Sequence, residues 1–326
     1  MTAEPRAMNK GPAAIRSPGW LGMSEGTAWL SAFRWPHWSK NLIAFAPIVM
    51  AARVNDGAAW LGSALAVVAL SLAASAVYLV NDVLDREADR LHPVKRERLI
   101  ASGRIGVRAA LLAALLCSSA ALLLAAWTGA WVGLIVLLYL ASSYAYVSAL
   151  KRLKFLDAGL LALLFALRLL AGTYAAGLPP SPWLMALALS AFSSLALAKR
   201  AGELVLPDQA VRMAGRGYDV RDLPAVRTVG LTAGGVATLV MFTYVASAAY
   251  DPAYHLTPQW LWVTPLALLT FLGRMWWLAW VGRLASDPIV ISWRDPVLLL
   301  AGAALVLSFL ASMQVVGAEA GLRSFL

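Results

Sequence analysis

Long apolar stretches recur along the sequence, and they restrict the possible folds more than any other feature. A helix needs about 20 apolar residues to cross the roughly 30 Å hydrocarbon core of a bilayer, and several stretches reach that length. Hydrophobic residues make up 61% of the chain and charged residues only 13%, whereas about a quarter of an ordinary soluble domain is charged. A water-soluble fold could not bury so much apolar surface. We therefore predict an all-α, polytopic membrane protein.

Nine candidate spans result when the apolar stretches are bounded by turn residues and charges. They cover residues 38–53, 59–83, 107–127, 130–149, 156–176, 183–205, 225–249, 259–282 and 295–316. The first span is short and contains Pro47. We expect a mobile cytoplasmic tail over residues 1–33, a nine-span membrane domain over 34–316, and a short C-terminal tail over 317–326.

Lys and Arg are distributed unevenly between the connections. They crowd the connections after the second, fourth and sixth spans, whereas residues 127–131, 177–183 and 247–259 contain neither. Cytoplasmic loops of membrane proteins carry this excess, so we expect those three connections and the N-terminus to be cytoplasmic. The formal charge of +10 lies mostly in loops, which suits anionic lipid headgroups or a polyphosphate rather than nucleic acid.

The strongest local signal closes the second span, where residues 81–89 read Asn-Asp-Val-Leu-Asp-Arg-Glu-Ala-Asp. On one continuous helix, the carboxylates of Asp82, Asp85 and Asp89 would fall within an arc of about 60°. Three like charges so close require a cation, and Mg²⁺ shared with a phosphate ligand is suited to carboxylate oxygens. The alternative is a solvated helix end whose acids pair with Arg86 and Arg90.

Basic residues follow directly, in the sequence His-Pro-Val-Lys-Arg-Glu-Arg over residues 92–98, and such donors suit phosphate oxygens. Ionisable residues in or beside a span are functional candidates because partners must offset their desolvation. The candidate ligand-binding residues are Lys40, Asn41, Lys95, Arg96, Arg98, Lys151, Arg168, Lys199, Arg200, Glu203 and Tyr218. Two alternatives stay open: Lys199 and Glu203, one turn apart, could pair with each other, and Arg168 could neutralise a buried acid.

These motifs resemble a known family. Asn-Asp-x-x-Asp-x-x-x-Asp followed by His-Pro-x-Lys-Arg resembles the first aspartate-rich motif of the UbiA superfamily of intramembrane prenyltransferases. Residues 38–41 (Trp-Ser-Lys-Asn), 95–98, 198–204 and 292–295 resemble the branch that includes decaprenyl-phosphate phosphoribosyltransferase. The likeness extends over roughly residues 34–316. It departs from the aromatic prenyltransferases after the sixth span, where Asp208, Asp219 and Asp222 do not form their Asp-x-x-x-Asp motif.

The resemblance implies a nine-helix bundle of the UbiA type that is catalytic over residues 34–316. It implies transfer of 5-phosphoribosyl from phosphoribosyl diphosphate (PRPP) to a polyprenyl phosphate such as decaprenyl phosphate, with release of diphosphate. Asp82, Asp85 and Asp89 would hold Mg²⁺, and Asn81 would orient a carboxylate or a ribose hydroxyl. We expect the site at the cytoplasmic face of a bacterial inner membrane. Prenyl transfer from a polyprenyl diphosphate to an aromatic acid, or transport, are the alternatives.

Overall fold

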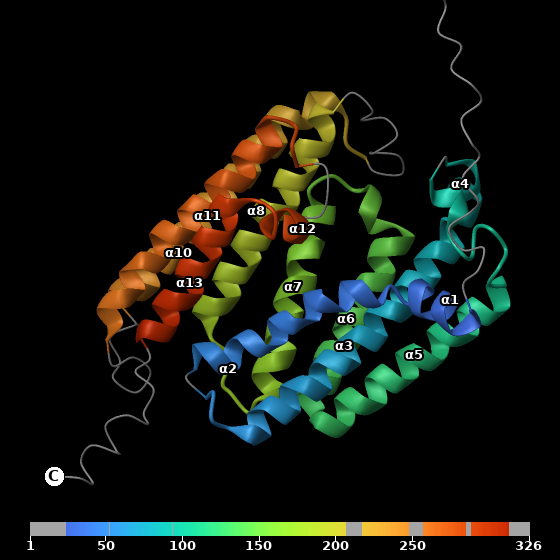
Figure 1. Cartoon of the computed structure of the whole chain (residues 1–326), viewed down its shortest axis with the longest axis horizontal. Coiled ribbons are helices and arrows are strands. Elements are labelled where there is room, and N and C mark those ends of the chain that lie inside the picture. Colours follow the sequence, from blue (N-terminus) through green and yellow to red (C-terminus); the bar gives the residue numbers. More distant parts are fainter. Residues whose placement is uncertain are drawn as a thin grey trace, which may run out of the picture.

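The computed structural model describes residues 24–51, 53–92, 94–206, 217–247, 257–284 and 288–312. Every regular element in these ranges is a helix (Figure 1). The first half contains α1 (Glu25–Ala32), η1 (Trp35–Phe45), α2 (Ala46–Met50), α3 (Gly57–Leu84), α4 (Arg86–Leu91), η2 (Lys95–Glu97), α5 (Val107–Thr128), α6 (Ala130–Ser148), η3 (Leu150–Arg152) and α7 (Leu156–Ala175). The second half contains α8 (Pro182–Val205), η4 (Val220–Asp222), α10 (Leu223–Ser247), η5 (Pro258–Trp262), α11 (Val263–Trp280), α12 (Pro288–Ser292) and α13 (Pro296–Ser312).

Seven stretches within the described ranges are helical, apolar and long enough to cross a membrane. They are Gly57–Leu84, Val107–Thr128, Ala130–Ser148, Leu156–Ala175, Pro182–Val205, Val220–Ser247 and Pro258–Trp280. These correspond to the predicted second to eighth spans. Helices are expected here because lipid cannot hydrogen-bond to the backbone, so each segment must satisfy its own N–H and C=O groups. α13, at the predicted ninth span, is apolar but has only 17 residues.

The predicted first span differs most from expectation, because half of it, residues 38–45, lies in a 3₁₀ helix. η1 has 11 residues and leads directly into the five-residue α2. A 3₁₀ helix rises about 2.0 Å per residue against 1.5 Å in an α-helix, so the two elements together extend roughly 30 Å. Sixteen residues can therefore cover a depth that an α-helix covers with about 20.

Specific contacts hold η1 against α3 and α7. Trp38 Nε1 donates to Ser75 Oγ at 3.0 Å, and Asn41 Nδ2 donates to Ser71 Oγ at 2.9 Å. A Cβ atom at Gly172 of α7 would lie 1.9 Å from the carbonyl oxygen of Ala44. Glycine is therefore required at position 172, because only the bare backbone admits η1 at this distance.

Residues 25–32, which the sequence prediction assigns to a tail, form helix α1. Ser24 caps it by accepting a hydrogen bond from the backbone N–H of Thr27 at 3.3 Å. Ala28 and Ala32, one turn apart, are buried in a cluster with Leu79 of α3. This small apolar face attaches α1 to the bundle. The remaining predicted tail residues, 1–23 and 317–326, lie outside the described residues.

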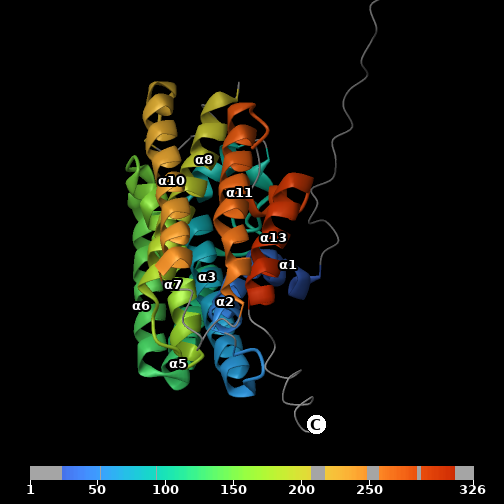
Figure 2. The same cartoon turned by 90° about the vertical axis from the view of Figure 1, so that its left-hand side faces the viewer.

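The long helices lie side by side and alternate in direction (Figure 2). One core cluster joins η1 with α3, α5, α6 and α7, and another joins α7, α8, α10, α11 and α13. The described parts of the Lys- and Arg-rich connections, residues 85–92, 94–106, 149–155 and 217–222, lie at one end of the bundle, below called the basic end. Ion pairs between these connections confirm that they meet there. The candidate site lies among them.

Candidate active site

The aspartate-rich motif does not lie on one continuous helix. α3 ends at Leu84 and α4 begins at Arg86, with Asp85 between them at φ −88°, ψ 2°. Asp82 and Asp89 are buried, whereas Asp85 is half-buried. Within the described part of the chain no three acidic, His or Cys side chains are close enough to hold a metal ion. The prediction that the three carboxylates lie on one helix face is therefore wrong. The helix is interrupted at Asp85, so this side chain is turned away from those of Asp82 and Asp89.

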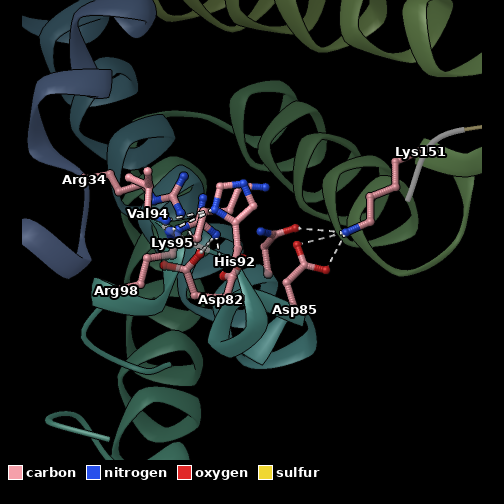
Figure 3. Close-up of polar contacts among 10 residues, drawn as sticks. Arg34, Asp82, Asp85, His92, Val94, Lys95, Arg98 and Lys151 are labelled. Atoms are coloured by element: carbon pink, nitrogen blue, oxygen red, sulfur yellow. Dashed lines mark hydrogen bonds and ion pairs between the residues drawn. The ribbon is translucent and has the colours of Figure 1, made fainter. Parts of the chain in front are cut away.

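Two arginines from different segments reach Asp82 (Figure 3), and one of them, Arg98, also reaches Asp89. Arg34 Nη2 lies 2.5 Å from Asp82 Oδ1. Arg98 Nη1 lies 3.1 Å from the same oxygen and 2.7 Å from Asp89 Oδ2. Two carboxylate oxygens therefore converge on one cationic nitrogen, which offsets the repulsion between the aspartates. The predicted alternative partners are not used: Arg90 pairs with Glu87 at 3.2 Å instead.

Asp85 has a separate cation. Lys151 Nζ, from the connection between α6 and α7, lies 2.9 Å from Asp85 Oδ1 and 3.4 Å from Asn81 Oδ1. Figure 3 shows this pair on the opposite side of the motif from Arg34 and Arg98. The first motif thus contacts basic groups from three elements, and Asn81 and Lys151, both predicted site residues, lie together.

Sequence reasoning missed Arg34, although it stands just before the Trp-Ser-Lys-Asn motif. Its backbone is left-handed, with φ 52° and ψ 45°, which is uncommon for a residue other than glycine. Its guanidinium lies 4.8 Å from the centre of the Tyr78 ring as well as contacting Asp82. An unfavourable backbone conformation at a charged residue that contacts the motif is typical of functional sites.

The 92–98 segment turns so that only its last arginine faces the aspartates. His92 Nδ1 accepts hydrogen bonds from the backbone N–H groups of Val94 and Lys95, at 3.1 and 3.2 Å. Lys95 and Arg96 are exposed on η2, while Arg98 is half-buried beside Asp82. Pro93 lies outside the described residues. The predicted phosphate donors are therefore separated into one inner arginine and two outer residues.

A cavity of about 730 Å³ opens beside Asp82. α1 and the start of η1 form one wall, and Leu99 and Ile100 form part of the other. Its charged lining consists of Arg34, Asp82, Glu97 and Arg98. The carboxylate of Asp82 and its two arginines are therefore accessible to a ligand from the α1 side.

Arg168 lies deeper, inside the bundle. Its Nε donates to Asn41 Oδ1 at 2.8 Å, one Nη donates to Tyr139 Oη at 2.8 Å, and the other donates to the Leu164 carbonyl at 2.8 Å. No carboxylate contacts it among the described residues, so the expected alternative of a buried acidic partner does not hold within them. Lys40, half-buried on η1, also interacts electrostatically with Tyr139.

Three further predicted residues, Arg200, Glu203 and Tyr218, form a second cluster together with Asp157. This cluster is here called the tyrosine cluster. Arg200 Nε lies 2.8 Å from Asp157 Oδ2, and its Nη1 lies 2.9 Å from Glu203 Oε2. Tyr218 Oη donates to Asp157 Oδ1 at 2.5 Å. Glu203 therefore pairs with Arg200; Lys199 beside it is half-buried.

Burial, and then the hydrogen bond to Asp157, raise the pKa of Tyr218 above its usual value, so its phenol keeps its proton and acts as a donor. Asp157 also escaped sequence reasoning. It is an acid inside the first turn of a predicted span, which is the same signal that identified Arg168. The four side chains of the tyrosine cluster thus contact one another directly.

Comparison with known proteins gives a family match over most of the chain. A model described as the UbiA prenyltransferase family matches residues 41–293, a range that includes the aspartate motif, Lys151 and the tyrosine cluster. The chain belongs to the UbiA prenyltransferase family.

Several curated relatives are about one-third identical to the chain. Over 287 residues it is 35% identical to "Uncharacterized protein y4nM" of Sinorhizobium fredii, covering 87% of the chain and 56% of that protein. Over 241 residues it is 32% identical to "Nodulation protein NoeC" of Azorhizobium caulinodans, covering 72% of the chain and 77% of that protein. Over 215 residues it is 35% identical to "Decaprenyl-phosphate phosphoribosyltransferase" of Mycolicibacterium smegmatis, covering 63% and 66%. The chain thus spans little more than half the length of y4nM.

Solved UbiA structures have the same fold. A UbiA homolog from Archaeoglobus fulgidus bound to GPP and Mg²⁺ has a TM-score of 0.67 at 14% identity, covering 86% of this chain and 96% of that one. A digeranylgeranylglyceryl phosphate synthase has a TM-score of 0.62 at 15% identity, covering 89% and 99%. At this identity the likeness concerns the fold alone.

Two acids of the connection after the sixth predicted span make local contacts. Asp219 and Asp222 cap η4 reciprocally, and Asp222 also lies 2.8 Å from Lys154 Nζ. Asp295, two residues beyond the matched region, caps α13 by accepting from the N–H groups of Val297 and Leu298. Asp208 lies outside the described residues.

Proposed function

We propose that the chain catalyses Mg²⁺-dependent transfer of a 5-phosphoribosyl group from PRPP to a polyprenyl phosphate, with release of diphosphate. The observation that carries the proposal is the pairing of Asp82, Asp85 and Asp89 with Arg34, Arg98 and Lys151. Carboxylates are needed to bind a metal and basic groups are needed to bind phosphates, and here the two kinds of side chain lie together. Relatives named decaprenyl-phosphate phosphoribosyltransferase, about one-third identical to the chain, support this choice of reaction.

The residues present fit a hard divalent cation. Carboxylate oxygens are the ligands that Mg²⁺ prefers, usually one or two together with substrate phosphates and water. Asp82 Oδ1 and Asp89 Oδ2 already converge on a cationic atom, Arg98 Nη1. If Arg98 bound a phosphate oxygen, these two oxygens would be available to hold the metal. Asp85, which is turned away from them and paired with Lys151, would reach the metal through water.

The chemistry then follows from charge. The bond between C1 of the ribose and the diphosphate oxygen breaks, C1 becomes oxocarbenium-like, and negative charge grows on the leaving diphosphate. Bound Mg²⁺ would stabilise that charge as a Lewis acid. Arg34, Arg98 and Lys151 would bind phosphate oxygens through charge-assisted hydrogen bonds and fix the donor's orientation.

The acceptor needs no strong base. A polyprenyl phosphate is an anion near neutral pH, so one of its oxygens can form the new bond to C1 without losing a proton first. Lys40 and Arg168 are our candidates for the acceptor phosphate. Arg168 contacts only neutral groups among the described residues, and an uncompensated cation within a bundle attracts an anion.

The direct test is an incubation of purified protein with Mg²⁺, PRPP and a polyprenyl phosphate, followed by mass spectrometry of the lipids. We expect a lipid-linked phosphoribose, and we expect a chelator to prevent its formation. The second candidate, aromatic prenyl transfer, is tested in parallel with a prenyl diphosphate and 4-hydroxybenzoate. Prenylation of the acid, with PRPP intact whichever polyprenyl phosphate is supplied, would replace the first proposal by the second.

We also propose that the basic end faces the cytoplasm of a bacterial inner membrane. In a Cys117→Ala background, which removes the only cysteine, a cysteine at exposed Ser102 should resist an impermeant thiol reagent in intact cells. A cysteine at exposed Asn55, at the opposite end of α3, should react. The reverse pattern would place the basic end outside.

A further inference from the structure

A short segment after α8 is docked on the connection between α6 and α7. A Cβ atom at Gly217 would lie 2.2 Å from the carbonyl oxygen of Arg152, so the two backbones are in direct contact. Lys154 and Asp222 form an ion pair at 2.8 Å. The rings of Tyr218 and Phe155 meet edge to face with their centres 5.9 Å apart. Backbone, charge and ring contacts thus join residues 217–222 to residues 152–155.

The hydroxyl of Tyr218 is the centre of this contact. It accepts a hydrogen bond from the backbone N–H of Phe155 at 2.6 Å and donates one to Asp157 at 2.5 Å. Phe155 has φ 63° and ψ −37°, a conformation that persists only where surrounding contacts impose it. Tyr218 supplies one of those contacts at the residue where the connection turns into α7.

The hydroxyl is itself held firmly. Asp157 and Arg200 are almost completely buried, and their ion pair joins α7 to α8. Tyr218 therefore joins the connection to a buried ion pair, and breaking such a pair is costly. The connection cannot shift without disturbing this network.

The same connection carries Lys151, four residues before Phe155, on η3. Lys151 contacts Asp85 and Asn81 of the aspartate motif. We propose that Tyr218 is a positioning residue: its hydroxyl fixes the α6–α7 connection so that Lys151 lies over Asp85, where it binds the diphosphate. The ligand role of Lys151 rests on the proposed function, whereas its position does not.

Steady-state kinetics of Tyr218→Phe test the proposal. This change removes only the oxygen that contacts Phe155 and Asp157. Loss of a hydrogen bond to a charged group corresponds to roughly 10-fold or more in affinity, so we expect KM for PRPP to rise by about that factor. KM for the polyprenyl phosphate should stay within about twofold, because the change leaves Lys40 and Arg168, our candidates for the acceptor phosphate, in place. The matched control is Tyr144→Phe, whose hydroxyl contacts Ser118 at 2.7 Å within the bundle.

A double-mutant cycle with Lys151→Ala separates positioning from general damage. If Tyr218 acts through Lys151, the double variant should be no worse than Lys151→Ala alone, since coupled residues are non-additive. Multiplicative effects of the two changes on KM for PRPP would overturn the proposal.

A readout that needs no catalysis distinguishes failure of this inference from failure of the proposed function. Lys151 has a side chain only 17% exposed, so peptide-resolved labelling with an amine reagent should be slow in the wild type and faster in Tyr218→Phe. Gly217→Ala should have the same effect, with Gly235→Ala, where a Cβ meets nothing within 4 Å, as its control. Unchanged labelling of Lys151 in both test variants would overturn the positioning role even if PRPP proved to be the substrate. Faster labelling would support it even if PRPP were not.

Discussion

The aspartate motif and the tyrosine cluster both lie at the basic end, and both combine acids with basic residues from distant segments. They differ in exposure. The side chains of Arg34 and Arg98 are 23% and 29% exposed, whereas that of Arg200 is 2% exposed. A partly exposed ion pair has a smaller net free energy than a fully buried one, because water competes for the exposed arginine. Under the proposed function, the pairs of the aspartate motif would exchange for a metal and phosphates, whereas we expect the buried pairs of the tyrosine cluster to stay in place.

The largest expected effect is on stability, in the tyrosine cluster. Arg200→Ala would leave Asp157 and Glu203 buried without this cation, which costs about 3–5 kcal/mol. We expect a large fall in the Tm of the detergent-solubilised protein. Arg53→Ala, which breaks an exposed pair with Asp56, is the control and should cost less than about 1 kcal/mol. Equal Tm values for the two variants would remove the distinction between the clusters.

The aspartate motif should show the opposite behaviour, with loss of activity and little loss of stability. Asp82→Asn removes a proposed metal ligand worth several kcal/mol, so we expect turnover to fall about 100-fold or more at saturating Mg²⁺. The Tm should change little. Glu87→Gln, an exposed acid of the adjoining α4, should retain activity. Near-normal Mg²⁺-dependent turnover of Asp82→Asn would refute the metal assignment.

The inner and outer basic residues of the 92–98 segment should also differ. Arg98→Ala deletes the contact with Asp82 and Asp89 and should raise KM for PRPP by about 10- to 100-fold. Arg98→Lys should recover part of the loss. Arg96→Ala should change KM by less than about threefold, because Arg96 is exposed on η2. If Arg96→Ala were the more damaging variant, the segment would have to turn when substrate binds.

The smallest expected effect concerns pH. Burial and the hydrogen bond to Asp157 raise the pKa of Tyr218 above its ordinary value of 10.0. A raised pKa means that the stabilisation is complete below about pH 10 and is lost as pH rises through the folded pKa. The Tm difference between wild type and Tyr218→Phe should therefore stay constant from about pH 6 to 9 and decrease above about pH 10. A decrease near neutral pH would mean that another group titrates in this cluster.

The sequence was sufficient to predict the membrane class, seven of the spans, and that the basic connections lie at one end of the bundle. The length of each apolar stretch and the placement of Lys and Arg depend on the lipid and not on tertiary contacts. Both can therefore be recognised in the sequence. The partners of the aspartates could not be found in this way. Arg34 and Lys151 lie 48 and 66 residues from their carboxylates, and no local pattern encodes such pairing.

Two local features could not be predicted from the sequence, for physical reasons. A helical arc for Asp82, Asp85 and Asp89 assumes an unbroken helix, but the helix is interrupted at Asp85. Asp157 of α7 contacts both Arg200 and Tyr218, and sequence spacing cannot reveal such a contact between distant segments.

The 3₁₀ geometry of η1 has a consequence for how related sequences should be compared. Trp38, Asn41 and Ala44 are each three residues apart, and each contacts α3 or α7. Side chains three apart eclipse in a 3₁₀ helix, whereas in an α-helix they would drift by about 60° per step. Inserting or deleting one residue here would turn the later contacts away by about a third of a turn. We therefore expect relatives to conserve the length of this segment more strictly than its residue types, so that gaps in an alignment should fall outside residues 38–44.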